Sequence, residues 1–541
     1  MSDGRTRLGL VVAGSLTDGI EARLDPGVSV EDMAVGRYVV VEGRQRRFFG
    51  MVTDVKLATS NPQFAISPPD VSDPFVAEVI DGTSTFGHLE VMPMLTIGRD
   101  EGAALAEPQP VKTVPSHFSP VTEADEEDVA SVFGAEDEQH FYVGKPLDME
   151  TKVCLNLDRL IERSIGVFGK SGTGKTFLTL LLLSGVIKQN KAVNLVFDMH
   201  NDYGWQVKAE SGYDIKGLRQ VLGSRVAIFT LDEQSTRDRG VSADEVVEIG
   251  YDEIEPEDIA LLRETLGMTE AQIESIYRLS RRFGERSWLA EFLAMPVEDR
   301  EILAQETGLN PSTLTVLHRK MDTRVARLPF LRPESRTNSV RKILEYLKAG
   351  RSVVLEFGRH NSLDAYILVA NILTRRIHEQ YVEEKDRAQG KKSAEPPHLL
   401  ITIEEAHKFL NPQVADQTIF GTIAREMRKY NVTLLVVDQR PSGIADEVMS
   451  QIGTRVTCLL DDDKDIAAVL SGVSGAQSLR GVLARLDSKQ QALILGHAVP
   501  MPVVIRTRDY GTTEFYGEFQ FAEAAGLHKQ ALADLDDLFP E

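Results

Sequence analysis

The stretch SIGVFGKSGTGKT, residues 164–176, decides the fold of this chain. Its second part, Gly169–Thr176, matches the pattern G-x-x-x-x-G-K-[ST] at every fixed position, with a strand-like apolar run before it and a helix-like apolar run after it. Glycines at these positions let backbone N–H groups fold around a phosphate at the start of a helix, where the helix dipole favours anions. Lys175 would then reach the β- and γ-phosphates of a nucleotide, and Thr176 would ligate Mg²⁺. The sequence therefore predicts a nucleotide site formed by Gly169, Ser171, Gly172, Thr173, Gly174, Lys175, Thr176 and Phe177.

Two further strand patterns end in acidic residues. Asn194–Asp198 ends in a carboxylate, and Leu399–Ile403 is followed directly by Glu404 and Glu405. Two carboxylates at a strand end beside a phosphate loop can divide the work: Glu404 would hold the Mg²⁺ and Glu405 would polarise the attacking water. The alternative is an ordinary acidic strand end. Glu404 departs from the usual pattern, because an Asp is commoner at its position.

A polar residue follows the next strand pattern, Thr433–Val437. There Asp438 is followed by Gln439, whose amide could hydrogen-bond a γ-phosphate and sense its hydrolysis. The phosphate loop, the adjacent Glu405 and this sensor together indicate an ATPase with an additional strand between the two Walker motifs. We therefore exclude a Ras-like GTPase, and the sequence contains no guanine-reading Asn-Lys-x-Asp.

Two arginines, Arg425 and Arg428, lie between the last two strand patterns. An arginine there cannot easily reach the phosphate that Lys175 serves. In a ring it could reach the γ-phosphate of a neighbour and stabilise the transition state. The alternative is a basic helix face, because the two arginines are three residues apart.

Composition limits the class of protein. The 541 residues are 42% hydrophobic and carry a net charge of 60 − 82 = −22, which argues against a chain that coats DNA non-specifically. The longest apolar run, Phe177–Ile187, is too short to cross a bilayer, and the N-terminus lacks the order of a signal peptide. Two cysteines give neither a disulfide framework nor a zinc pattern. We expect a cytoplasmic protein without a membrane segment, in which the basic stretch Pro311–Arg351 is either a phosphate contact or a solvated helical face.

The composition and the predicted secondary structure change along the chain. Residues 1–100 have short strand patterns, such as 38–41, 48–52 and 76–80, that predict a small β-barrel. Residues 101–145 are rich in Pro, Ala and acids and predict an acidic linker. We expect an α/β P-loop ATPase core in two parts, 146–250 and 339–541, with a C-terminal tail. A helical insertion would separate them at 251–338, where Thr269 with Gln272 predicts a capping box.

The motifs taken together resemble the HerA family of hexameric DNA translocases, in the HerA/FtsK branch of RecA-like ATPases. The resemblance rests on five segments and on strands 35–41 and 49–55, which resemble that family's barrel; the segments are Gly169–Thr176, Asp198–Tyr203, Ile403–Phe409, Ala424–Tyr430 and Asp438–Ser442. By this resemblance the core is RecA-like, ATP and Mg²⁺ bind at Lys175 and Thr176, and Glu404 holds the metal. Glu405 would be the catalytic base, Gln439 the sensor, and Arg425, or failing that Arg428, the finger acting on the neighbour. The family usually has Gly-Glu where this chain has Asn201-Asp202.

The resemblance also implies a function. We expect an ATP-driven homo-hexameric ring that translocates double-stranded DNA, with a NurA-like nuclease in end processing or with another effector in anti-phage defence. One alternative is a soluble ring motor for protein secretion or conjugation. Another is a module whose ATP site gates assembly with an effector.

Overall fold

The computed structural model describes residues 6–519, apart from 81–82, 99–107, 209–213, 336–337, 361, 392–394, 414, 416–417 and 474. The chain divides into two compact units. The first comprises Met1–Leu160, Phe168–Lys175 and Gly453–Arg508, and the second comprises Ile161–Val167, Thr176–Ile452 and Asp509–Glu541. Among the described residues, no helix combines the length and apolarity needed to cross a membrane.

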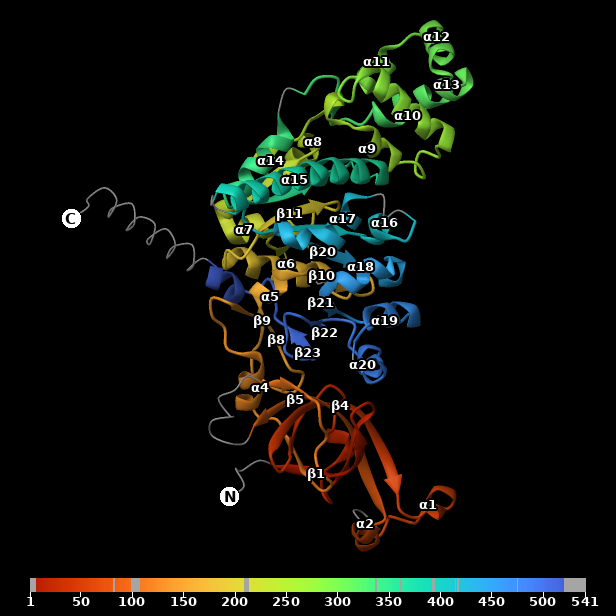
Figure 1. Ribbon diagram of the computed structural model, residues 1–541. Coiled ribbons are helices and arrows are strands. Elements are labelled where there is room, and N and C mark those ends of the chain that lie inside the picture. Colours follow the sequence, from red (N-terminus) through yellow and green to blue (C-terminus); the bar gives the residue numbers. More distant parts are fainter. Residues whose placement is uncertain are drawn as a thin grey trace, which may run out of the picture. The chain divides into compact units, whose positions relative to one another are not determined.

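A closed barrel of six strands forms the N-terminal part of the first unit (Figure 1). The strands follow the order β2-β1-β7-β3-β4-β5, and pairing of β2 with β5 closes the barrel while short β6 extends β5. Alternate residues point inward, so that Val39, Val41 and Val52 are fully buried in its core. The strands are β1 (Arg7–Ser15), β2 (Gly19–Leu24), β3 (Tyr38–Glu42), β4 (Arg46–Thr59), β5 (Thr85–Gly98), β6 (Gln109–Pro110) and β7 (Pro120–Glu123).

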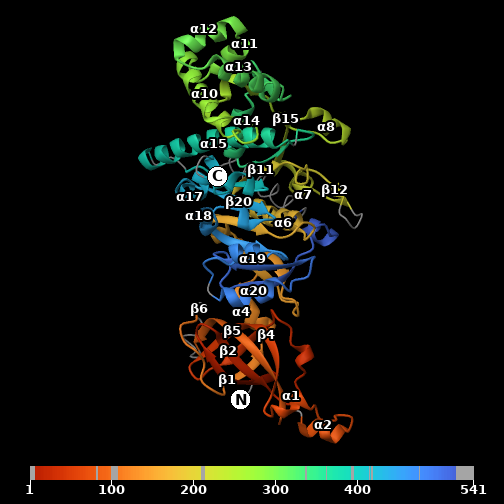
Figure 2. The same cartoon turned by 90° about the vertical axis from the view of Figure 1, so that its right-hand side faces the viewer.

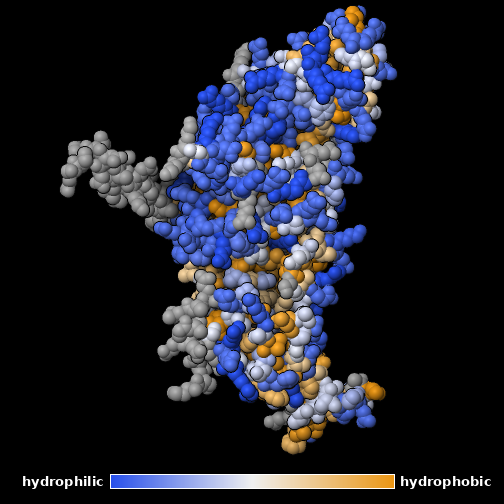
Figure 3. All heavy atoms as spheres, in the orientation of Figure 1, coloured by the Kyte–Doolittle hydropathy of each residue, from blue (hydrophilic) through white to orange (hydrophobic). Residues whose placement is uncertain are grey.

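The long β4–β5 hairpin carries two helices at its tip, α1 (Gln63–Ile66) and α2 (Pro74–Ile80) (Figure 2). The predicted strand at 76–80 is therefore wrong. Pro74 lies in the first turn, and Asp73 accepts a hydrogen bond from the Phe75 N–H at 2.9 Å, which starts a helix. Hydrophobic side chains remain exposed at this end of the unit (Figure 3), including Leu57, Ile66, Val71, Phe75 and Val79.

The segment that we expected to be a linker, 101–145, is ordered in its described part. β7 pairs with both β1 and β3 and so completes the barrel. The acids that suggested a linker serve the fold instead: Asp125 and Asp128 form the capping box of α4 (Glu126–Phe133), and buried Asp128 pairs with Arg47 at 2.6 Å. Acidic composition alone therefore misled the sequence interpretation.

A run of five strands completes the first unit. Its strands run in the order β21-β22-β23-β8-β9, with antiparallel pairs throughout. Tyr38 of the barrel is buried, and its hydroxyl accepts a hydrogen bond from the Val504 N–H at 3.1 Å. The elements are β8 (His140–Lys145), β9 (Val153–Asn156), β21 (Ile452–Thr457), α19 (Asp463–Val469), α20 (Ala476–Leu483), β22 (Gln491–Gly496) and β23 (Val503–Thr507).

The second unit is built on a sheet with the strand order β15-β14-β18-β11-β19-β20-β10. The pairs from β15 to β20 are all parallel, and the central strands are buried along their whole length, as a sheet covered on both faces requires. The strands are β10 (Ser164–Phe168), β11 (Val193–Asp198), β14 (Val226–Thr230), β15 (Glu245–Val246), β18 (Ser352–Glu356), β19 (Leu399–Glu404) and β20 (Val432–Asp438).

Helices cover this sheet. Helix α6 (Lys175–Lys188) is buried from Leu178 to Ile187. Three others pack on named strands: α7 on β14, α14 on β18 and β11, and α17 on β20. The remaining bounds are α7 (Leu218–Leu222), α8 (Glu233–Asp238), α14 (Ser339–Lys348), α15 (Leu363–Lys391), α16 (His407–Leu410), α17 (Ile419–Glu426) and α18 (Asp446–Gln451).

A group of helices occupies the segment where we expected an insertion. Its two ends meet, because β16 (Ile249–Gly250) pairs with β17 (Leu331–Arg332). The predicted capping box of Thr269 and Gln272 is confirmed at the start of α10. The group contains α9 (Pro256–Ala260), α10 (Glu270–Phe283), α11 (Trp288–Ala294), α12 (Val297–Thr307) and α13 (Pro311–Lys320). Buried Asp258 of α9 accepts from Arg375 of α15 at 2.7 Å, which ties the group to the sheet-covering helix.

The predicted fold class is confirmed. The chain is an α/β protein with an N-terminal six-stranded barrel and a core built on a parallel sheet. Within the core, β20 lies between β10, which leads into the phosphate loop, and β19, which ends in Glu404. This is the additional strand that the sequence predicted.

Candidate functional site

The phosphate loop connects β10 to α6 and has the backbone that its glycines predict. Gly172 and Gly174 have φ angles of 77° and 92°, which residues with a side chain rarely adopt. A Cβ on Gly169 would lie 2.8 Å from both the Cys458 Cβ and the Thr173 Oγ1, so any larger residue would clash. Helix α6 begins at Lys175, and its first N–H groups therefore follow the loop directly.

Hydrogen bonds inside the first unit fix the loop. The Lys170 N–H donates to the Leu459 O at 3.0 Å, and the Cys458 N–H donates to the Phe168 O at 2.8 Å. The Lys175 Nζ donates to the Lys170 O at 2.8 Å, and the Thr173 Oγ1 donates to the same carbonyl at 2.8 Å. The Lys175 ammonium group has three N–H donors, so its contact with the carbonyl does not prevent it from also donating to a phosphate.

In the second unit, a row of carboxylates lies at the carboxyl ends of adjacent strands. Asp198 ends β11 beside Glu356 of β18, and Glu404 ends β19 beside β20, which ends in Asp438. All four side chains are buried. Parallel strands place such residues at one edge of the sheet, where ligands of α/β proteins bind.

Each member of the row has a different partner. Asp198 accepts from the N–H groups of Asp202, Tyr203 and Gly204 at 2.8, 2.9 and 3.3 Å. Glu356 pairs with Arg239. Glu404 Oε1 accepts from the Tyr203 hydroxyl at 2.9 Å, while Glu404 Oε2 is buried and has no hydrogen-bond partner among the described residues.

Burial dominates the electrostatics of Asp198 and Glu404. It raises the pKa of Asp198 to about 7, with the Glu356 charge adding to the effect, and it raises the pKa of Glu404 to about 8, with the Asp198 charge adding to it. A cation beside them would lower the free-energy cost of keeping both buried carboxylates charged. The orphaned Glu404 Oε2 is an oxygen ligand of the kind that Mg²⁺ prefers. No cluster of three or more metal ligands is found in the described part of the chain.

The predicted base and sensor lie together. The Gln439 Nε2 donates to the Glu405 Oε1 at 2.7 Å. Glu405 has a φ angle of 49°, in the left-handed region, and residues held there against their preference cluster at functional sites. Behind them, Asp438 accepts from the N–H and the ring Nδ1 of His407, and this hydrogen bond raises the pKa of His407.

Asn201 replaces the glycine that the resemblance led us to expect. Its φ angle is 61°, a conformation that glycine adopts freely and asparagine tolerates. The Asn201 Oδ1 also accepts from the Gly358 N–H at 3.0 Å, which holds the turn after β11 against the loop after β18. The departure from the family pattern therefore keeps the backbone that the pattern requires.

The two candidate finger residues do not belong to the strands whose ends carry the carboxylates. Arg425 belongs to α17, its side chain is 28% exposed, and its Nη1 lies 3.8 Å from the Glu447 Oε2 of α18. At that separation the two side chains form a weak surface pair. The side chain of Arg428 falls outside the described residues.

The basic stretch 311–351 has its charges largely paired inside the second unit. Arg324 pairs with Asp364 at 2.6 Å and Lys342 with Glu245 at 2.8 Å. Arg332, Arg341, Lys348 and Arg351 also have acidic partners. Exposed pairs of this kind are typical of a solvated helical face.

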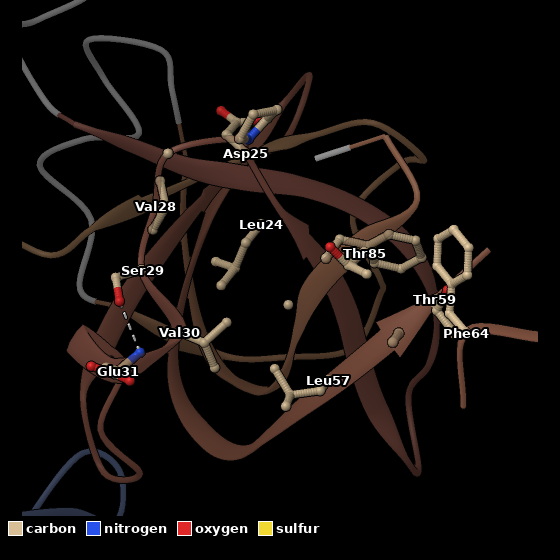
Figure 4. A pocket seen from close by; sticks show the side chains of 15 residues that line it. Leu24, Asp25, Val28, Ser29, Val30, Glu31, Leu57, Thr59, Phe64 and Thr85 are labelled. Carbon is tan, nitrogen blue, oxygen red and sulfur yellow. Dashed lines mark hydrogen bonds between the residues drawn. The ribbon is translucent and has the colours of Figure 1, made fainter. Parts of the chain in front are cut away.

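A pocket of about 910 Å³ lies in the barrel (Figure 4), away from every predicted site residue in the sequence. Leu24, Val30 and Leu57 line it together with polar Asp25 and Thr59. None of the carboxylates of the row and none of the phosphate-loop residues lines this pocket.

Two site features were not assigned from the sequence. The tyrosines Tyr203 and Tyr366 both contact Glu404, and Glu356 extends the acidic row. A signal existed for Glu356, because the run 352–356 is another buried strand that ends in an acid. No local signal identifies the tyrosine contacts, since Tyr366 is distant in sequence from Glu404.

Comparison with known proteins places these features in context. The family model of the HerA helicase central domain matches residues 141–377, and the HAS barrel domain model matches residues 8–79. The DNA double-strand break repair helicase HerA of Pyrococcus furiosus is 23% identical over 400 residues, covering 68% of this chain and 70% of the relative. The protein of the same name from Saccharolobus solfataricus is 24% identical over 393 residues, covering 72% of each chain.

Two solved structures are among those that match this chain. VirB4 of Thermoanaerobacter pseudethanolicus has a TM-score of 0.43 and 14% identity, covering 70% of this chain and 98% of its own. The bacterial conjugative coupling protein TrwB has a TM-score of 0.45 and 12% identity, covering 72% and 93%. The resemblance to the HerA family is confirmed: the barrel matches the HAS barrel domain model, and the segment that follows matches the model of the HerA central domain.

Proposed function

We propose that this chain is an ATPase that assembles into a homo-hexameric ring and translocates double-stranded DNA. The observation that carries the proposal is the edge formed by β19 and β20. There Glu404, Glu405 and Gln439 lie at the ends of β19 and β20, and β20 is the neighbour of β10, which leads into the phosphate loop. The HerA relatives, whose names describe repair helicases, support DNA as the partner.

The residues of the chain divide the work as follows. Gly169, Ser171, Gly172, Thr173, Gly174 and Phe177 shape the nucleotide site, and Lys175 contacts the β- and γ-phosphates. Glu405 accepts the proton of the attacking water. Gln439 donates to Glu405 at 2.7 Å and so orients that carboxylate, and we assign it the role of sensing the γ-phosphate.

Thr176 and Glu404 are the residues that would hold Mg²⁺. When bound, the ion neutralises charge on the β- and γ-phosphates. Glu404 offers its unpaired Oε2 for this role, and burial keeps competing water away from it.

In a ring, Arg425 would have a nucleotide phosphate of the neighbouring subunit to contact. Among its contacts inside the chain is Glu447, whose side chain is 79% exposed and whose Oε2 lies 3.8 Å from the Arg425 Nη1. In a ring the guanidinium would leave Glu447 for the γ-phosphate of the neighbouring subunit. Arg428 is the second candidate for the same role.

The charge distribution bears on the second candidate function. The chain is acidic overall, and the basic stretch is paired internally, so DNA would be held by few cations. This observation favours, as the alternative, a ring motor that moves protein in secretion or conjugation, or one whose ATP site gates assembly. A NurA-like nuclease or another defence effector as partner rests on the family resemblance.

DNA should accelerate ATP hydrolysis by the wild-type chain, and the effect should fall as salt rises from about 50 to 200 mM, because each phosphate contact releases counterions. Hydrolysis is measured by phosphate release with and without duplex DNA. The Glu405→Gln variant should bind ATP and DNA but not hydrolyse ATP, since it loses the base and keeps the phosphate loop.

Unchanged hydrolysis on adding DNA, at low and high salt alike, would reject DNA translocation and support the protein motor. Hydrolysis by Glu405→Gln within about threefold of wild type would reject Glu405 as the base.

The backbone of Glu405 allows a second test, on stability. Glu405→Gly and Glu405→Ala both remove the carboxylate, and both should be inactive. The left-handed conformation costs an alanine roughly 1–2 kcal/mol, and glycine loses part of that advantage through its freer unfolded chain. The glycine variant should therefore be more stable than the alanine variant by about 1 kcal/mol in urea unfolding. Equal stabilities would show that this backbone is not strained.

Mixing two inactive proteins tests the ring. Lys175→Ala lacks the phosphate-binding amine, and Arg425→Ala lacks the proposed finger. In a mixed ring, a Lys175→Ala subunit can offer its intact Arg425 to the intact loop of an Arg425→Ala neighbour, so some hydrolysis should return. Arginine fingers contribute roughly 10³–10⁵ in rate, which makes recovery easy to measure.

The control is the same mixture made with Arg428→Ala in place of Arg425→Ala. A mixture of the Lys175 and Arg425 variants that stays inactive, in rings shown by native mass spectrometry to be mixed, would contradict a finger role for Arg425.

A further inference from the structure

Tyr203 lies at the end of a short chain of contacts that leads to Glu404. The carboxylate of Asp198, buried at the end of β11, accepts three backbone N–H groups of the turn that follows it. Tyr203 is part of that turn and is itself fully buried, and its hydroxyl donates to the Glu404 Oε1 at 2.9 Å. The turn after one strand therefore sets the carboxylate at the end of the next.

Glu404 needs such a support because of its length. A glutamate has one more rotatable bond than the aspartate commonly found at this position, so its carboxylate can adopt more orientations. The main chain of Glu404 is held separately: its N–H donates to the Tyr366 hydroxyl at 3.2 Å, and the same hydroxyl lies 3.3 Å from the Glu404 carbonyl oxygen. Tyr366 therefore fixes the backbone, and Tyr203 fixes the side chain.

The two carboxylate oxygens of Glu404 are not equivalent. Oε1 is occupied by the Tyr203 hydroxyl, whereas Oε2 is buried without a hydrogen-bond partner among the described residues. Leaving a buried acceptor unpaired is unfavourable unless a ligand completes it. The orientation that Tyr203 imposes therefore keeps one specific oxygen available.

We propose that Tyr203 is a positioning residue for magnesium: its hydroxyl holds the Glu404 Oε1 and so presents the Glu404 Oε2 to the Mg²⁺ that accompanies ATP. This inference rests on the proposed ATPase function and extends it to a residue that does not touch the nucleotide. Partners that orient a metal ligand in this way typically change metal affinity or activity 10–100-fold when they are removed.

The Tyr203→Phe variant tests the proposal. It removes the hydroxyl and keeps the buried ring, so packing is preserved. Binding of a fluorescent ATP analogue is measured first in EDTA and then across a Mg²⁺ titration. The variant should bind the analogue in EDTA as wild type does, and its half-saturating Mg²⁺ concentration should rise about 10–100-fold.

Tyr381→Phe is the matched control. Tyr381 is fully buried in α15 of the same unit, and its hydroxyl has no hydrogen-bond partner among the described residues. This variant should have the wild-type Mg²⁺ dependence. In a Glu404→Gln background, Tyr203→Phe should shift the Mg²⁺ dependence less than threefold further, because the two residues act through one contact.

Two outcomes would overturn the proposal. One is a half-saturating Mg²⁺ concentration of Tyr203→Phe within threefold of wild type. The other is an equal loss of analogue binding in EDTA and in Mg²⁺, which would show a structural role. If Tyr203→Phe fails to fold, the same titration is made with Tyr203→Leu and Tyr203→Met, whose side chains also lack a donor, and wild-type Mg²⁺ dependence in either would overturn the proposal. If wild type itself fails to bind the analogue, the proposed ATPase function fails instead.

Discussion

The burial of several carboxylates at one edge of a parallel sheet is the constraint on which the site depends. Removing a carboxylate from water is costly unless it is paired, hydrogen-bonded or bound to a metal. Asp198 is satisfied by backbone N–H groups, Glu356 by Arg239 and Asp438 by His407. Glu404 is satisfied on one oxygen alone. The row thus contains three carboxylates with partners inside the protein, and a fourth, Glu404, with one oxygen that has no hydrogen-bond partner among the described residues and can bind a ligand.

The phosphate loop shows a similar division between holding and binding. Contacts with Leu459 and Cys458 fix the loop backbone, and burial raises the pKa of the Cys458 thiol to about 11, so this cysteine acts as a packing residue. The Lys175 amine is engaged with a carbonyl of its own loop, an interaction that a phosphate can replace. Rigid backbone and exchangeable side chain are the properties that a nucleotide site needs.

Much of this was predictable, for physical reasons that differ from element to element. The strands around the phosphate loop are continuous apolar runs, and the capping box at Thr269 uses local hydrogen bonds, so both are visible in the sequence. The acids of 122–138 and the apolar run 76–80 misled us because tertiary pairing and a local cap decided their structure. The contacts of Tyr203 and Gln439 with Glu404 and Glu405 join residues far apart in the chain, and no local pattern encodes them.

The central claim is that Thr176 and Glu404 hold the ion while Glu405 stays free of it to act as base. The most direct measurement is a crystal structure of the chain with a non-hydrolysable ATP analogue and Mn²⁺, whose anomalous signal locates the metal. We expect the metal about 2.1 Å from the Thr176 hydroxyl. The Glu404 Oε2 should contact it directly or through one water. A metal bound by Glu405, or one lying on Asp198 and Glu356 with Glu404 turned away, would contradict the account.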